Sequence, residues 1–136
     1  MMAWIEPKTD WNENDYFNAS DYNRITGNIR HVIEMAREFY NDLQESLISE
    51  DKTYQSLIYA REMNEIEDVL DSLNQQTYNL KIGDKQTYYP NQSTPLWSEF
   101  NRIENAIFTI YKTINAQKDA ITRLAFTLGG QKGFKV

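Results

Sequence analysis

A nine-residue repeat occurs three times in the chain and constrains the fold more than any other feature. Each copy begins with an acidic residue, has a large apolar residue second and Asn third, and carries aliphatic residues fifth and ninth. Positions two, five and nine are spaced three and four residues apart, which places them on one face of a helix. The leading acid suits a helix N-terminus, where it faces unpaired N–H groups. The three copies cover residues 21–29, 62–70 and 99–107.

The apolar pattern around each copy predicts a long helix, so the expected fold is all-α: a helical bundle with coiled-coil-like seams. We expect the first helix over residues 20–47, the second over 54–75 and the third over 96–128. In the first and third helices the apolar residues recur at alternating steps of three and four. A third helix of about 30 residues would be roughly 45 Å long at 1.5 Å per residue. Part of its apolar stripe should therefore extend beyond the shorter second helix.

The segments outside the helices complete what we expect to be a single domain of 136 residues. Residues 1–19 form an aromatic-rich N-terminal arm, which either wraps its own bundle or anchors in another subunit. Residues 77–94 alternate in polarity around Gly83 and Asp84, which predicts a small β-hairpin between the second and third helices. Gly129 and Gly130 should end the third helix and leave residues 129–136 as a C-terminal tail.

Charge and composition exclude several classes of protein. The net charge of −6 disfavours generic nucleic-acid binding, so no nucleic-acid partner is expected. Residues 1–111 hold 9 Lys and Arg against 19 Asp and Glu, whereas residues 112–136 hold 5 basic residues against one acid. No apolar run approaches the roughly 18 residues of a membrane span, and no basic, apolar leader precedes the arm. We therefore expect synthesis in a cytoplasm, from which the chain can move to another location, and no membrane partner.

The sequence nominates no catalytic residue, cofactor site or metal site. There is no cysteine, and His31 is the only histidine, so neither a thiolate site nor the paired His ligands of a di-metal bundle can form. The acidic run between Glu62 and Asp71 is interpreted as a solvated helix face. Asn23, Asn64 and Asn101 share the third position of the repeat, and we expect each amide to cap the backbone of a neighbouring segment.

Residues that could form an assembly interface lie in the arm, on the third helix and in the tail. Large aromatic residues in the arm are costly to leave in water, since burying one contributes on the order of 2 kcal/mol. Gln117 interrupts the apolar seam of the third helix, as expected either of a register-setting polar residue or of a partly hydrated position. The candidate interface residues are Trp4, Trp11, Tyr16, Phe17, Ile114, Gln117, Ile121, Leu124 and Phe134.

Several short motifs resemble a pattern found in tail-associated structural proteins of phages and prophages of Gram-positive bacteria. Among them are Trp-Ile-Glu-Pro-Lys-Thr-Asp-Trp at residues 4–11 and Thr-Pro-Leu-Trp-Ser-Glu-Phe-Asn-Arg-Ile-Glu at residues 94–104. The other matching stretches are residues 15–18, 21–25, 50–54, 60–67 and 87–89. The resemblance implies a particle component near the tail or baseplate, in some relatives the N-terminal module of a tail fibre protein. It implies no catalytic residue.

The function expected from these features is structural rather than enzymatic. The chain would act as an assembly or adaptor protein of a phage or phage-derived particle, contacting copies of itself and other particle proteins through seams and terminal arms. A homo-oligomer is expected, with a trimer as the candidate stoichiometry. One alternative is a carbohydrate- or receptor-binding module of the same particle, because planar aromatic rings stack on sugars. A second alternative is a cytoplasmic regulatory helical protein.

Overall fold

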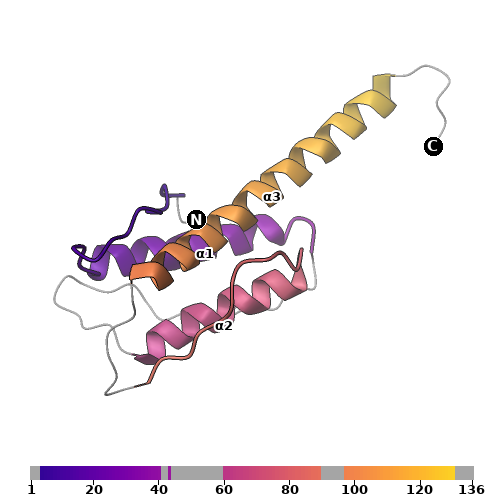
Figure 1. The fold of residues 1–136 in the computed structure, drawn as a ribbon. Coiled ribbons are helices and arrows are strands. Elements are labelled where there is room, and N and C mark those ends of the chain that lie inside the picture. Colours follow the sequence, from indigo (N-terminus) through magenta and orange to yellow (C-terminus); the bar gives the residue numbers. More distant parts are fainter. Residues whose placement is uncertain (1–3, 41–42, 44–59, 90–96, 131–136) are drawn as a thin grey trace.

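The computed structural model describes residues 4–40, 43, 60–89 and 97–130, with side chains as far as residue 124. Three helices follow one another along the chain: α1 (Ala19–Ala36), α2 (Ala60–Gln76) and α3 (Trp97–Gly130). Helices α1 and α2 lie alongside the first part of α3, whose yellow C-terminal part projects away from them (Figure 1). The described residues contain no strand, so the all-α expectation is confirmed for them.

The repeat places its apolar positions where the periodicity predicted. Positions two, five and nine of all three copies are buried, and together they form the centre of the core. The leading acid of each copy lies in the first turn of its helix, as expected. At α1, Asn18 is the N-cap and forms a capping box with Asp21. The buried repeat residues are Tyr22, Ile25, Ile29, Met63, Ile66, Leu70, Phe100, Ile103 and Ile107.

Helix α1 ends earlier than the predicted residue 47. The backbone N–H groups of Glu38 and Phe39 bond carbonyls three residues back rather than four, so the last turn tightens after Ala36. Phe39 and Leu43 still pack against the core, because the turn keeps their side chains directed toward the core. The apolar spacing therefore predicts which side chains reach the core, but its last residues lie in a turn and not in the helix. The predicted positions 44–47, and 54–59 of the second helix, lie outside the described residues.

The predicted β-hairpin over residues 77–94 is wrong for its described part, 77–89, which contains no strand. Its polar groups bond α2 instead: the Asn74 side chain accepts from the backbone N–H of Leu80 and donates to its carbonyl oxygen, both at 2.8 Å. Asn79 and Gly83 have positive φ angles of 49° and 87°, which bend the segment without a two-residue hairpin turn. Two strands alone are marginal, whereas docking on a helix packs the partly buried side chains of Leu80 and Ile82 against the core.

Helix α3 begins one residue later and ends two residues later than the expected range 96–128. It contains 34 residues and runs through Gly129 and Gly130, so the prediction that the glycines end it at residue 128 is wrong. At 1.5 Å per residue it spans about 51 Å, against about 27 Å for α1. This difference is why its last part extends beyond the other helices (Figure 1). Residues 131–136 of the predicted tail lie outside the described residues.

The N-terminal arm packs on its own bundle. The ring of Trp4 stacks on Tyr111, with centroids 3.7 Å apart and planes 3° from parallel. The ring of Phe17 stacks on Phe100 at 4.2 Å, and Trp11 is buried beside both. The arm thus supplies part of the core, which matches the first of the two interpretations of its aromatic residues.

Candidate functional site

Two polar clusters, each centred on a buried glutamate, fasten extended segments onto the helices. The first, the Trp11 cluster, consists of Trp11, Arg24, Asn101 and Glu104. The Asn101 side chain accepts a hydrogen bond from the backbone N–H of Trp11 at 2.8 Å and donates to its carbonyl oxygen at 3.0 Å. One amide therefore satisfies both backbone groups of an arm residue, as a neighbouring strand would.

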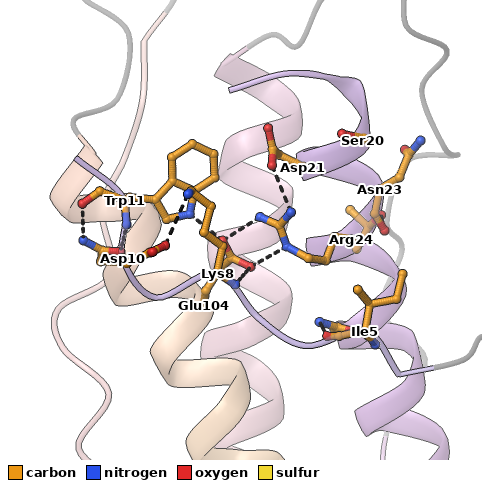
Figure 2. Close-up of polar contacts among 12 residues, drawn as sticks. Ile5, Lys8, Asp10, Trp11, Ser20, Asp21, Asn23, Arg24 and Glu104 are labelled. Atoms are coloured by element: carbon orange, nitrogen blue, oxygen red, sulfur yellow. Dashed lines mark hydrogen bonds and ion pairs between the residues drawn. The ribbon is translucent and has the colours of Figure 1, made fainter. Parts of the chain in front are cut away.

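Glu104 is the centre of the Trp11 cluster, and its side chain is 1% exposed. The guanidinium of Arg24 donates to both of its carboxylate oxygens, each at 2.8 Å, in the bidentate geometry that arginine and carboxylate favour. The indole N–H of Trp11 and the backbone N–H of Lys8 also donate to this carboxylate. Figure 2 shows Arg24 from α1 and Trp11 from the arm both directed at Glu104 on α3.

The second group, the Tyr88 cluster, consists of Asn64, Glu67, Tyr88 and Arg102. The Asn64 side chain accepts from the backbone N–H of Tyr88 at 2.7 Å and donates to its carbonyl oxygen at 2.8 Å. The Tyr88 hydroxyl donates to Glu67 at 2.6 Å, and Arg102 forms an ion pair with the same carboxylate. Glu67 is 2% exposed, so this carboxylate is as deeply buried as that of Glu104.

The two clusters are built alike from the same positions of the repeat. In each, the third-position Asn holds the backbone of an aromatic residue, and the sixth-position Glu accepts from the side chain of that residue. The Arg comes from the fourth position of another copy, where it also pairs with its own leading acid three residues earlier, Asp21 or Glu99. The repeat is therefore a docking device as well as a helix opening.

The electrostatics of the clusters favour charged arginines and neutral tyrosine. Burial lowers the pKa of Arg24, but its hydrogen bonds and charge interactions with Glu104 and Asp21 outweigh this and raise the pKa overall. Arg102 shows the same balance with Glu67 and Glu99, and its pKa is raised. Burial and the nearby Glu67 carboxylate raise the pKa of the Tyr88 hydroxyl.

A third and a fourth asparagine repeat the same backbone contact. Asn28 on α1 accepts from the backbone N–H of Ile5 at 2.9 Å and donates to its carbonyl oxygen at 2.7 Å. Asn74 holds Leu80 in the same way. The capping role predicted for Asn64 and Asn101 is confirmed, and for Asn23 it stays a prediction. Asn28 and Asn74 lie outside the third position of the repeat, so the sequence pattern did not single them out.

The acidic run on α2 is not the solvated face that was predicted. Glu62 and Glu67 are 1% and 2% exposed, whereas Asp68 lies at the surface and pairs with Lys85 at 2.7 Å. Periodicity alone could not show this, because Glu67 becomes buried only where Arg102 and Tyr88 reach it from other segments. The one available signal was that Arg and Glu recur at the fourth and sixth positions of the repeat.

The residues predicted to form an assembly interface fall into three groups. Trp4, Trp11, Phe17 and Ile114 pack inside the chain. Gln117 is half-buried and accepts a hydrogen bond from the Tyr78 hydroxyl, so its polar group has a partner in its own chain. Tyr16, Ile121 and Leu124 are 88%, 46% and 59% exposed, respectively. Phe134 lies outside the described residues.

The described residues form neither a candidate metal site nor a candidate membrane span. No group of three or more His, Asp or Glu side chains among them could hold a metal ion. None of the described helices is both long enough and apolar enough to cross a membrane. His31 lies near the rings of Trp4 and Tyr111, at 5.9 and 6.0 Å between centroids, in the packing of the arm.

Comparison with known proteins identifies no relative. No family model, curated protein or solved structure matches the chain. Two features of the structure bear on function: the docking clusters and the projecting part of α3. The clusters direct their buried polar groups at other parts of the same chain. The projecting helix is where apolar seam residues face outward.

Proposed function

We propose that this protein is a non-enzymatic structural component of a phage or phage-derived particle, an assembly or adaptor protein of the tail or baseplate region. The observation that carries the proposal is the exposed seam of α3: Ile121 and Leu124 are 46% and 59% exposed on a helix whose earlier seam residues are buried. Apolar residues that continue a packed seam into solvent are typical of a surface that another protein covers.

The docking clusters support the same proposal. Four asparagine side chains fix extended segments onto the helices, and two ion pairs connect α3 to α1 and to α2, giving a body with defined surfaces. An adaptor needs such a body because a flexible one would lose conformational entropy on assembly. The location in a tail or baseplate rests on the sequence resemblance to tail-associated structural proteins of phages and prophages of Gram-positive bacteria.

The proposal is tested by quantifying the protein in purified particles. Particles would be released from a strain carrying the coding sequence and purified by density gradient, and their proteins measured by quantitative mass spectrometry. We expect a fixed copy number per particle in the tail-containing fraction, and loss of intact tails when the sequence is deleted. Absence of the protein from particles whose other tail proteins are detected would reject the proposal and favour a regulatory role in the cytoplasm.

A second candidate function is carbohydrate or receptor binding by the same particle component. It is favoured by the exposed aromatic residues Tyr16, Tyr89 and Trp97, at 88%, 57% and 45% exposure, because exposed rings can stack on sugar faces. This function requires the purified protein to bind cell-wall glycan and to lose that binding when Trp97 is replaced by Ala. Failure to sediment with purified cell walls would remove it and leave the structural proposal intact.

A further inference from the structure

The apolar seam of α3 is covered by its own chain before Gln117 and is exposed beyond it. Ile110 and Ile114, the two preceding seam residues, are completely buried in the body of their own chain. Gln117 accepts a hydrogen bond from the Tyr78 hydroxyl. The ring of Tyr78 packs edge-on against that of Tyr40, with 5.7 Å between the ring centroids. Ile121 and Leu124 are the next positions of the same spacing and are exposed. The uncovered face is therefore a direct continuation of a packed interface.

The exposed face is shaped for another helix. Gln117, Ile121 and Leu124 follow one another at steps of four and three residues, and Ala120 lies three residues after Gln117 and four before Leu124, so all four lie on one face of the helix. Ala120 is small, which lets a second helix approach closely, and Ile121 and Leu124 occupy successive seam positions, as in coiled coils. Lys118 and Arg123 lie at exposed positions outside this row.

The distribution of charge selects the partner and its direction. The part of the chain up to residue 111 has 9 basic against 19 acidic residues, and residues 112–136 have 5 basic against one acidic residue. Two copies paired antiparallel through α3 bring the projecting part of the helix, where Lys118 and Arg123 outnumber Asp119, toward the acidic body of the other copy. A parallel pair would place the two acidic bodies at the same end, where they repel each other. In an antiparallel pair the two helix dipoles also point in opposite directions, which is their favourable arrangement.

We propose that two copies of this chain pair antiparallel through the projecting part of α3, around a twofold axis that passes between residues 122 and 123. This spacing places Ile121 of one copy opposite Leu124 of the other, on both sides of the axis. The interface is isologous and closed, so it forms a dimer rather than a filament. The inference rests on the proposed assembly function and names its first step. The two bodies lie at opposite ends of the dimer.

The first experiment measures the mass of the full chain in solution as a function of concentration. Because the seam beyond Gln117 is short, we expect a dimer that dissociates on dilution, with a mass approaching twice the 16.1 kDa of the chain at high concentration. Replacing Ile121 and Leu124 together with Gln should leave a monomer at all concentrations. The matched control is Ala116→Gln with Thr122→Gln, two exposed positions on the outer face that should keep the dimer.

The second experiment measures the direction of pairing. The chain has no cysteine, so Asn105→Cys introduces a single site for a nitroxide label on an exposed residue of α3. At 1.5 Å per residue, antiparallel pairing about the proposed axis separates the two labels by about 50 Å. Side-by-side bodies in a parallel dimer would bring them to less than about 40 Å, because packed helices lie 8–10 Å apart. Double electron–electron resonance spectroscopy measures the distance between the two nitroxide labels directly.

Several outcomes would overturn the inference. These are a wild-type chain that stays monomeric at high concentration, a trimer, a dimer unaffected by the paired Gln substitutions, or a short label distance. At a concentration low enough for the wild type to be monomeric, the helical circular dichroism and the unfolding midpoint of the Gln variant should equal those of the wild type, which shows that the loss of the dimer is not a loss of the fold. A monomeric protein that is still found in purified particles would contradict the dimer but leave the proposed function standing.

Discussion

Glu104 on α3 binds Arg24 on α1 through both carboxylate oxygens, although the two residues are 80 positions apart. The same carboxylate accepts from the Trp11 indole of the arm, so one buried side chain connects the arm to two helices. Glu67 has the corresponding role for Arg102 and Tyr88. The stability of the body should therefore be unusually sensitive to these two glutamates.

Replacing Glu104 with Ala should destabilise the fold by about 3–5 kcal/mol, because Arg24 keeps only Asp21 as a counter-charge and the Trp11 indole N–H loses its acceptor. The measurement is the free energy of unfolding from urea denaturation. The matched control is Asp10→Asn, which removes an ion pair with Lys8 at a carboxylate that is 87% exposed and should change stability by less than about 0.5 kcal/mol. Replacing Arg24 and Glu104 together with Met and Leu should restore only part of the lost stability, because the indole N–H of Trp11 and the backbone N–H of Lys8 still lack an acceptor. Equal stability of E104A and wild type would contradict the described cluster.

Replacing Asn101 with Ala should release part of the arm, because it removes both hydrogen bonds to the Trp11 backbone. We expect a loss of about 1–3 kcal/mol and faster hydrogen exchange at the Trp11 amide. Asn101→Asp keeps the acceptor but loses the donor, so its effect should be intermediate at neutral pH. Asn105→Ala, at an exposed position of the same helix, is the control and should leave exchange at Trp11 unchanged.

The protein should lose stability at alkaline pH through Tyr78. Burial, followed by the neighbouring Tyr40, raises the pKa of Tyr78 from 10.0 to about 12. The unfolded chain releases this proton at lower pH than the folded one, so the contribution is fully present below about pH 10 and is lost as the pH rises to about 12. The raised pKa of Tyr88 acts in the same direction.

The test of this pH dependence is the urea midpoint between pH 8 and pH 12 for the wild type and Tyr78→Phe. The Phe variant should show a smaller fall over the alkaline range, since it has no hydroxyl at this position. Tyr89→Phe is the control, at a ring that is 57% exposed, and should follow the wild type. Identical pH profiles for Y78F and wild type would show that Tyr78 does not carry the effect.

Replacing Gly83 with Ala should destabilise the docked segment. Gly83 has a φ of 87°, which L side chains rarely adopt, and an added Cβ would lie 2.6 Å from Cδ of Arg102. The backbone conformation alone costs roughly 1–2 kcal/mol, and displacement of Arg102 would weaken its ion pair with Glu67. Thermal unfolding checks this, with Asp84→Ala at the neighbouring exposed residue as the control. A G83A melting temperature equal to that of D84A would contradict the close approach.

The sequence by itself determined the helices and the face that each one buries. Tyr22, Ile66 and Ile107 are buried as their spacing required, because helical periodicity depends only on residues three and four positions apart. It also predicted the backbone-capping role of Asn64 and Asn101, since an amide carries both a donor and an acceptor.

Only the tertiary structure decided which segments meet. Spacing could not show that Glu67 is buried, because its partners Arg102 and Tyr88 come from other segments. For the same reason the spacing predicts a hairpin over residues 77–94. In the structure the side-chain amides of Asn74 and Asn64 on α2 bind the backbone groups of Leu80 and Tyr88 instead. Local spacing fixes the conformation of a helix, but the pairing of distant polar groups depends on how the helices are packed. That packing also decides where the seam of α3 is covered and where it is left exposed.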